Sequence, residues 1–188
     1  MIPSTARSDH ETAVRFPREI AAAVTLPAAA AALVAVGTVG TVGLTPAAAT
    51  AIVTACGALA TRMALVGFVA DVDAPAPRSI RSFDPFDDAV PPALLGFGPE
   101  PPRDRVRTAG DRCAESWRMW RADDGSPDAA TGAAGALAVG AWCAWALGSS
   151  ARAETRSRYA LETRPDDPLA GLVLRSVLAD SRPSWERR

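Results

Sequence analysis

Apolar residues follow a helical period in the second half of the chain. After Asp104 they recur every three or four positions, at Val106, Ala109, Cys113, Trp117 and Trp120. This spacing places them on one face of an α-helix, and the arginines and acids between them fall mostly off that face. The pattern predicts an amphipathic helix of about five turns whose charged side is solvated.

Three further helices are expected after this one. The run from Ala129 to Ala151 has no charge and predicts a helix of small residues over 130–147, followed by a tight turn at "GSS" and a second, charged helix over 151–164. "RPDDP" breaks the second helix. Asp167 and Pro168 then start a third, because aspartate caps free amides and proline is tolerated in the first turn. The third helix is apolar on two sides, so it requires two neighbours.

The N-terminal half has one clear helix start, at Thr45 and Pro46. The residues expected on its apolar face are Ala49, Ile52, Val53, Cys56, Leu59, Ala60 and Met63. Gly57 is a point at which the pattern breaks into two shorter helices, the second ending near Val72. In this interpretation Arg62 lies on the polar edge.

The remaining segments show no such period. Residues 1–19 are polar and mixed in charge, which predicts a loose arm. Prolines recur through residues 73–103 and exclude a long helix or a central strand there. We therefore expect a linker, in which Phe83 and Phe86 either anchor the loop on the helices or contact a partner.

Together these elements predict an all-α protein, a small helical bundle with a tetratricopeptide-like C-terminal hairpin and a third helix. The expected organisation is a flexible arm (1–19), apolar N-terminal helices (20–72), a Pro-rich linker (73–103) and a helical C-terminal domain (104–188). The C-terminal domain is expected to pack with residues 46–72.

The apolar N-terminal half also permits a membrane interpretation. No charge lies between Glu19 and Arg62, and Leu26–Leu44 is just long enough to cross a bilayer, which needs about 20 apolar residues. The stretch is rich in Ala, Gly, Thr and Val, however, so its insertion is marginal. We expect a cytoplasmic protein, with a membrane protein anchored through residues 20–44 as the alternative.

Net charge and cysteine content limit the kinds of partner and binding site that the sequence supports. All 20 basic residues are arginine, and the net charge of -1 gives none of the positive field of a nucleic-acid-binding protein. No nucleic acid partner is therefore expected. Cys56, Cys113 and Cys143 form no CxxC pair, which favours buried thiols in a reducing compartment over disulfides or a zinc site.

The usual signatures of catalysis are missing from the sequence. It contains no GxSxG, HExxH, P-loop or glycine-rich dinucleotide pattern. His10, the sole histidine, lies on the expected loose arm, and no base or metal partner for it is visible. We expect no catalytic residue, no cofactor and no metal.

The C-terminal helices fit the 34-residue tetratricopeptide plan when the unit is counted from Ala134. Leu137 takes the early bulky position, and Pro165 takes the proline position near the end. Ala141, Ala153 and Ala160 take the small positions, while Gly140, Ala144 and Ser157 depart from the plan, so the unit is a degenerate single copy. These matching residues and Trp117, Trp120, Trp142 and Trp145 are the expected core anchors.

The stretch "AWCAWALGSSARAETRSRYALETRPDDPLAGLVLRSVLADSRPSW", residues 141–185, resembles the C-terminal end of a family of uncharacterised proteins from high-GC Gram-positive (actinobacterial) bacteria, a domain of unknown function. The similarity extends more weakly back to about residue 50. "VPPALLGFGPE", residues 90–100, is similar to a signature that the family places near its N-terminus. The resemblance implies an order of helices and no activity.

Three classes of function follow as hypotheses. The first is a non-enzymatic helical module for protein interaction or self-association, through the third helix and the linker. Its candidate partner surface comprises Leu174, Leu178, Phe83 and Phe86. The others are a membrane-associated protein and an enzyme whose site is made of dispersed carboxylates and arginines.

Overall fold

Helix α5, Ala130–Ala146, lies at the centre of the molecule, and every residue from Gly132 to Ala146 is buried. The computed structural model describes the backbone of residues 5–35 and 43–186, with side chains from residue 17 onward; residues 1–4, 36–42 and 187–188 lie outside the described part. Over the described residues the protein is all-α: seven α-helices pack together and no strand occurs. This confirms the predicted all-α class.

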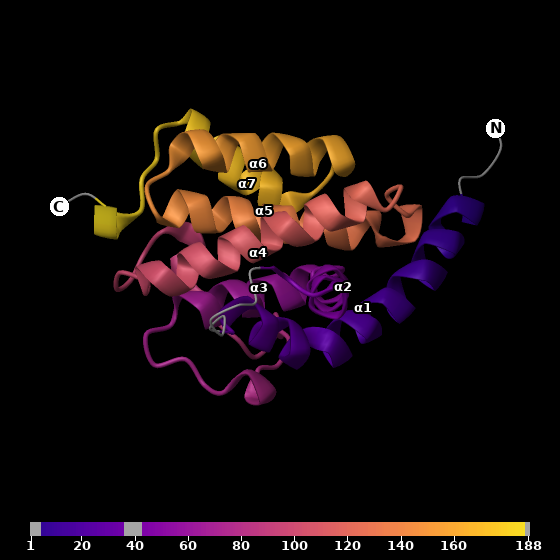
Figure 1. The fold of residues 1–188 in the computed structure, drawn as a ribbon. Coiled ribbons are helices and arrows are strands. Elements are labelled where there is room, and N and C mark those ends of the chain that lie inside the picture. Colours follow the sequence, from indigo (N-terminus) through magenta and orange to yellow (C-terminus); the bar gives the residue numbers. More distant parts are fainter. Residues whose placement is uncertain (1–4, 36–42, 187–188) are drawn as a thin grey trace.

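The helices form three layers (Figure 1). Helices α6 (Ser150–Thr163) and α7 (Pro168–Leu178) form the upper layer. The middle layer consists of α5 and α4 (Arg103–Ala122). Below it lie α1 (Thr5–Val34), α2 (Pro46–Ala55) and α3 (Leu59–Ala70). Helix α5 contacts α2, α3, α4, α6 and α7, so its lack of charge is explained by protein neighbours.

Glycines let the backbones of α5 and its neighbours approach closely. A Cβ atom added at Gly140 would lie 3.1 Å from the carbonyl oxygen of Gly110 in α4, and one added at Gly132 would lie 2.1 Å from that of Val53 in α2. The distance at Gly132 is one that real Cβ atoms do not adopt, and the distance at Gly140 is shorter than nearly all real Cβ contacts. The small residues of α5 are therefore a requirement of helix crossing, because cores are packed without spare volume.

Three predicted helix boundaries are confirmed. Thr45 caps α2 by accepting a hydrogen bond from the amide of Ala48, and Asp167 caps α7 by accepting one from the amide of Ala170. Gly148 adopts a left-handed φ of 74° directly after α5, a conformation that favours glycine. Ser149 precedes α6, but its side chain makes no capping hydrogen bond.

Two features of the N-terminal half differ from the sequence pattern. The backbone is helical from Thr5, within the segment of residues 1–19 that is expected to be a loose arm. The break at Gly57 bends α3 by 114° relative to α2, so the apolar face of α2 does not continue into α3. Leu59 is 44% exposed, whereas Arg62, expected at the polar edge, is 3% exposed.

The linker of residues 71–102 contains two short 3-10 helices, Pro77–Ser79 and Pro92–Leu95. Hydrogen bonds from tryptophan N–H groups connect the linker and the C-terminal segment to α5. The indole of Trp142 donates to the carbonyl of Ala93 (3.2 Å), and that of Trp145 donates to the carbonyl of Ser181 (2.8 Å). Trp185 in turn donates to the carbonyl of Ala146 (2.9 Å).

Two helical stretches of the described chain are long and apolar enough to cross a membrane, Pro17–Val34 and Pro127–Ala146. In the second stretch 83% of the residues are buried inside the bundle, whereas in the first only 28% are buried. The stretch that the sequence offered as an anchor, residues 20–44, includes residues 36–42, which lie outside the described part. Among the described residues, the exposed side of α1 is thus an apolar surface that the fold leaves uncovered.

Candidate interaction surface

Over residues 20–34, the side of α1 that faces away from the bundle carries no charge. We call it the outer face and define it by the exposed residues Ile20, Ala21, Ala23, Val24, Ala28 and Ala31. Val24 is 75% exposed and Ile20 is 52% exposed. The opposite side of the same helix is fully buried through Ala22, Leu26, Ala29, Ala30 and Leu33. From Ile20 to Val34, α1 is therefore apolar around its whole circumference, although only one side of this part contacts the rest of the bundle.

Contacts from α4 fix the orientation of the outer face. The guanidinium of Arg112 donates to the carbonyl oxygens of Ala32 and Ala35, the latter at 2.7 Å. These carbonyls belong to the last turn of α1, where no intrahelical donor is available. Pro27 also lacks an N–H for the carbonyl of Ala23, but Ala23 is exposed, so water supplies the missing donor.

A cleft of about 400 Å³ borders the outer face. It lies between α1 and the start of α3 and is lined by Ile20, Ala23 and Leu59 among others, with Glu19 at one end. Leu59 is one of the large exposed apolar residues of the protein. The outer face and this cleft together form a continuous apolar surface with a ridge and a groove.

The partner surface predicted from the sequence is divided between two parts of the molecule. Leu174 and Leu178 lie on α7 in the upper layer, and Leu178 is 64% exposed. Phe83 and Phe86 lie in the linker, and the amide of Phe83 bonds to α3, a helix of the lower layer (Figure 1). Phe83 donates its amide to the carbonyl of Ala60 and is half-buried, whereas Phe86 is 94% exposed. The four residues therefore do not form a single surface.

The predicted core anchors lie mostly inside the bundle. The buried ones are Trp117, Leu137, Ala141, Trp142, Trp145, Ala153 and Ala160. Trp120 is half-buried and donates its N–H to the carbonyl of Ser126 (3.0 Å). Pro165 is exposed in the turn between α6 and α7, so its role is to end α6 and it is not a core residue.

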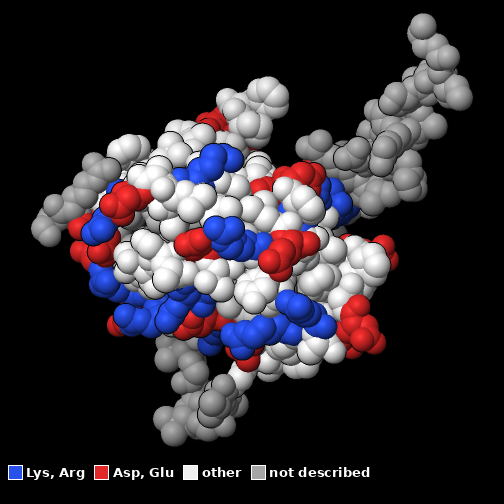
Figure 2. Space-filling model, turned by 90° about the horizontal axis from the view of Figure 1, so that it is seen from above, with Lys and Arg blue, Asp and Glu red and all other residues white. Residues whose placement is uncertain are grey.

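The charged residues of the upper face are interleaved by sign (Figure 2). Arg158 pairs with Glu154 (2.8 Å), and Arg156 pairs with Asp111 (2.9 Å). Exposed pairs of this kind contribute little to stability. Within each pair the opposite charges offset one another in the local field.

A buried ion pair joins the two halves of the chain. No local pattern in the sequence predicts it. Arg62 Nη1 of α3 lies 2.5 Å from Asp167 Oδ2 at the start of α7, and the two side chains are 4% and 0% exposed. Arg62 Nε also donates to the carbonyl of Cys56 (2.6 Å), and Nη2 donates to the carbonyl of Thr131 (3.3 Å). Asp167 uses its second oxygen to cap α7. Both charges are thus hydrogen-bonded as well as paired, which a buried pair requires.

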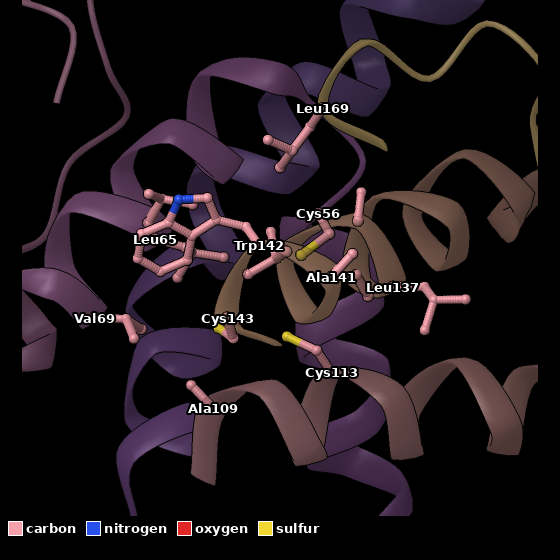
Figure 3. Packing of buried hydrophobic residues seen from close by; sticks show 14 of the residues in the cluster. Cys56, Leu65, Val69, Ala109, Cys113, Leu137, Ala141, Trp142, Cys143 and Leu169 are labelled. Carbon is pink, nitrogen blue, oxygen red and sulfur yellow. The ribbon is translucent and has the colours of Figure 1, made fainter. Parts of the chain in front are cut away.

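The three cysteines lie in the same core, on α4, on α5 and at the end of α2 (Figure 3). Burial raises the pKa of Cys143 to about 12, and burial, partly opposed by the nearby charge of Arg62, raises that of Cys56 to about 12. The pKa of Cys113 is also raised well above its usual range, again chiefly by burial. A buried, neutral thiol is a poor nucleophile and a poor metal ligand.

We expect the 3 cysteines to be unreactive toward Ellman's reagent in the folded protein at about pH 8 and fully reactive in concentrated urea. Their pKa values are raised only in the folded state, so the stability that they add is complete below the ordinary thiol pKa. It is lost as the pH rises toward about 12 for Cys56 and Cys143. The urea midpoint should accordingly fall between about pH 8 and about pH 10. Rapid labelling without urea would contradict this assignment.

No group of three or more His, Cys, Asp or Glu side chains within the described ranges is arranged to hold a metal ion. The side chain of His10 lies outside the described part.

Comparisons with protein-family models, with curated proteins and with solved structures give no match for this chain. The resemblance of residues 141–185 to an actinobacterial family therefore stays a prediction.

Proposed function

We propose that this protein is a non-enzymatic helical module that self-associates through the outer face of α1. The observation that carries the proposal is the uncharged, exposed side of a helix whose other side is fully buried in the core. Exposed apolar surface of this extent commonly marks a site of association. The proposal replaces the surface on α7 and the linker with one formed by a single element.

A second copy of the chain is the occupant that fits this surface best. Symmetric dimers pair the same patch from both subunits, so the patch must be compatible with itself. An uncharged face meets this condition because no like charges are brought together. Its alanines allow two helices to approach to about 8–10 Å, and the cleft beside Leu59 offers a groove for the partner's Val24.

The test is the oligomeric state of Val24→Glu, measured by light scattering across a range of protein concentrations. The wild-type chain is expected to be a dimer and the variant a monomer, because the new carboxylate would have to be buried without a partner. Val24 is 75% exposed in the monomer, so the circular dichroism and thermal midpoint of the variant should match those of the wild type at high dilution.

Leu178→Glu and Phe86→Glu are the matched controls, since each places the same charge on an exposed apolar site elsewhere. Both are expected to remain dimeric. Dissociation by Leu178→Glu alone would move the interface to α7 and overturn the proposal, as would a wild-type chain that stays monomeric at all concentrations.

Membrane association is a second candidate, favoured by one observation. Pro17–Val34 is apolar enough to span a bilayer and is only 28% buried. Insertion would, however, separate the buried residues of α1 from the core and break the contacts of Arg112 with the end of the helix. Cosedimentation with vesicles of neutral and anionic phospholipid distinguishes the two. A cytoplasmic location, supported by three free thiols, belongs to the self-association proposal.

We also propose that α5, α6 and α7 are a degenerate tetratricopeptide-like unit. The fully buried Ala141, Ala153 and Ala160 support this, because such units place small residues where their helices cross. The short turn between α5 and α6 is a second supporting feature.

A further inference from the structure

An open cleft of about 710 Å³ lies on the lower side of the bundle, away from the outer face of α1. It is bounded by the end of α1, the end of α3, the linker at residues 74–77 and the first half of α4. Phe68, Pro75 and Pro77 give it apolar walls, and its polar lining includes Arg105 and Thr108 of α4. Its size is in the range of small-molecule sites, about 300–1,000 Å³.

Arg105 is the unusual residue of this cleft. Its guanidinium lies over the ring of Phe68, with Cζ 4.3 Å from the ring centroid. Its Nε is buried and has no hydrogen-bond partner. Burial lowers the pKa of Arg105, and the charge of Asp71 offsets this only in part. An arginine remains charged in proteins, so the cleft presents a partly desolvated cation with unused donors.

The other charged residues of the cleft are already engaged. Asp104 accepts a hydrogen bond from Arg107 at 2.6 Å. Arg112 donates to the carbonyls of Ala32 and Ala35 at the end of α1. Asp71 acts on Arg105 through its charge alone, and among the described residues none forms a hydrogen bond or ion pair with Arg105. The guanidinium is therefore available to a bound acidic group.

We propose that this cleft binds a small organic anion, a molecule with one carboxylate or similar acidic head and an apolar body. The head pairs with Arg105, whose planar donors match an oxyanion, and Thr108 stands beside it on α4 as a further hydroxyl. The body lies against Phe68 and the linker prolines. This site is independent of the proposed self-association, because it shares no lining residue with the outer face.

The test compares two fluorescent probes that share an aromatic body. 1-Anilinonaphthalene-8-sulfonate carries an anionic head, and N-phenyl-1-naphthylamine carries none. The wild-type protein is expected to bind the anionic probe at one saturable site, and Arg105→Met should weaken that binding about tenfold. The neutral probe should bind both proteins equally, since methionine retains the apolar stem.

Arg118→Met is the matched control, because Arg118 is an exposed arginine on the same helix and does not line the cleft. It should bind both probes as the wild type does. Equal losses of both probes in Arg105→Met, or equal effects of the two substitutions, would overturn the proposal.

A competition experiment on the wild-type protein gives an answer that does not depend on the folding of any variant. Decanoate is expected to displace the anionic probe, and decanol, of the same chain length, is expected to displace it at least tenfold less well. Displacement by both with equal affinity would mean that the cleft recognises only the apolar body, and the assignment to Arg105 would be wrong.

Discussion

Arg62→Met should lower the free energy of unfolding by about 3–5 kcal/mol, the usual cost of breaking a buried ion pair. Removing the guanidinium leaves the Asp167 carboxylate, 0% exposed, without its charged partner. It also leaves the carbonyls of Cys56 and Thr131 without their donors. Small domains are stable by only about 5–15 kcal/mol, so a large fraction of the variant should be unfolded well below the wild-type midpoint.

The measurement is urea denaturation followed by circular dichroism. Arg81→Met is the control, because Arg81 pairs with Asp88 on the surface, where its side chain is 70% exposed, and such pairs contribute less than about 1 kcal/mol. A loss in Arg62→Met no larger than that of the control would show that the buried pair does not stabilise the fold.

A double-mutant cycle separates the ion pair from the cap. Asp167→Asn removes the charge but keeps an oxygen that can cap the amide of Ala170. The combination of Arg62→Met with Asp167→Asn should cost less than the sum of the two single substitutions, by about 0.5–3 kcal/mol, because no uncompensated charge remains. Strict additivity would contradict a direct interaction.

Gly135→Ala is expected to destabilise the protein although alanine is the better helix former. A Cβ atom at this position would lie 2.3 Å from both Arg62 Nε and the carbonyl oxygen of Cys56. Neither neighbour can move freely, since the guanidinium is held by Asp167 and the carbonyl belongs to the backbone. Overpacking of this kind costs about 1–3 kcal/mol, which exceeds the helix-propensity gain of up to about 1 kcal/mol.

Gly171→Ala is the matched control, a glycine in the interior of another helix. The nearest atom to its added Cβ is Nη1 of Arg175, at 3.3 Å, the mobile end of a long side chain. This substitution should stabilise the protein by about 0.4–1 kcal/mol. The urea midpoint should fall for Gly135→Ala and rise for Gly171→Ala. A rise for both variants would show that helix propensity outweighs overpacking at Gly135.

The sequence predicted the C-terminal helices well because their signals are local. The cap at Asp167, the left-handed glycine at Gly148 and the stripe through Cys113 and Trp117 each depend on residues a few positions apart. Such signals predict the folded structure correctly because the residues that interact are already close together in the sequence.

The buried face of α3 could not be predicted because it depends on the bend at Gly57. Extending the apolar face of α2 through the bend places Leu59 inside and Arg62 outside, and the fold does the reverse. The signal for Arg62 lies far away, in Asp167 and in the space left by Gly135. A single sequence does not connect positions so distant.

The candidate interaction surface shows the same contrast between local signals, which a sequence displays, and distant ones, which it does not. Exposure of Leu178 and Phe86 follows from their local patterns, but the outer face of α1 depends on how much of that helix the rest of the bundle covers. An uncharged stretch looks the same whether it is enclosed, as in α5, or half open, as in α1.

Arg62 and Asp167 stand 105 positions apart, and this separation bears on biosynthesis. When the ribosome has made α1 to α3, the arginine has no counter-ion, and α5, which must cover it, has not yet emerged. The nascent chain therefore exposes apolar surface until α5 to α7 have been translated, the circumstance in which chaperones bind. The N-terminal helices of this protein thus cannot complete their core before the C-terminal ones are made.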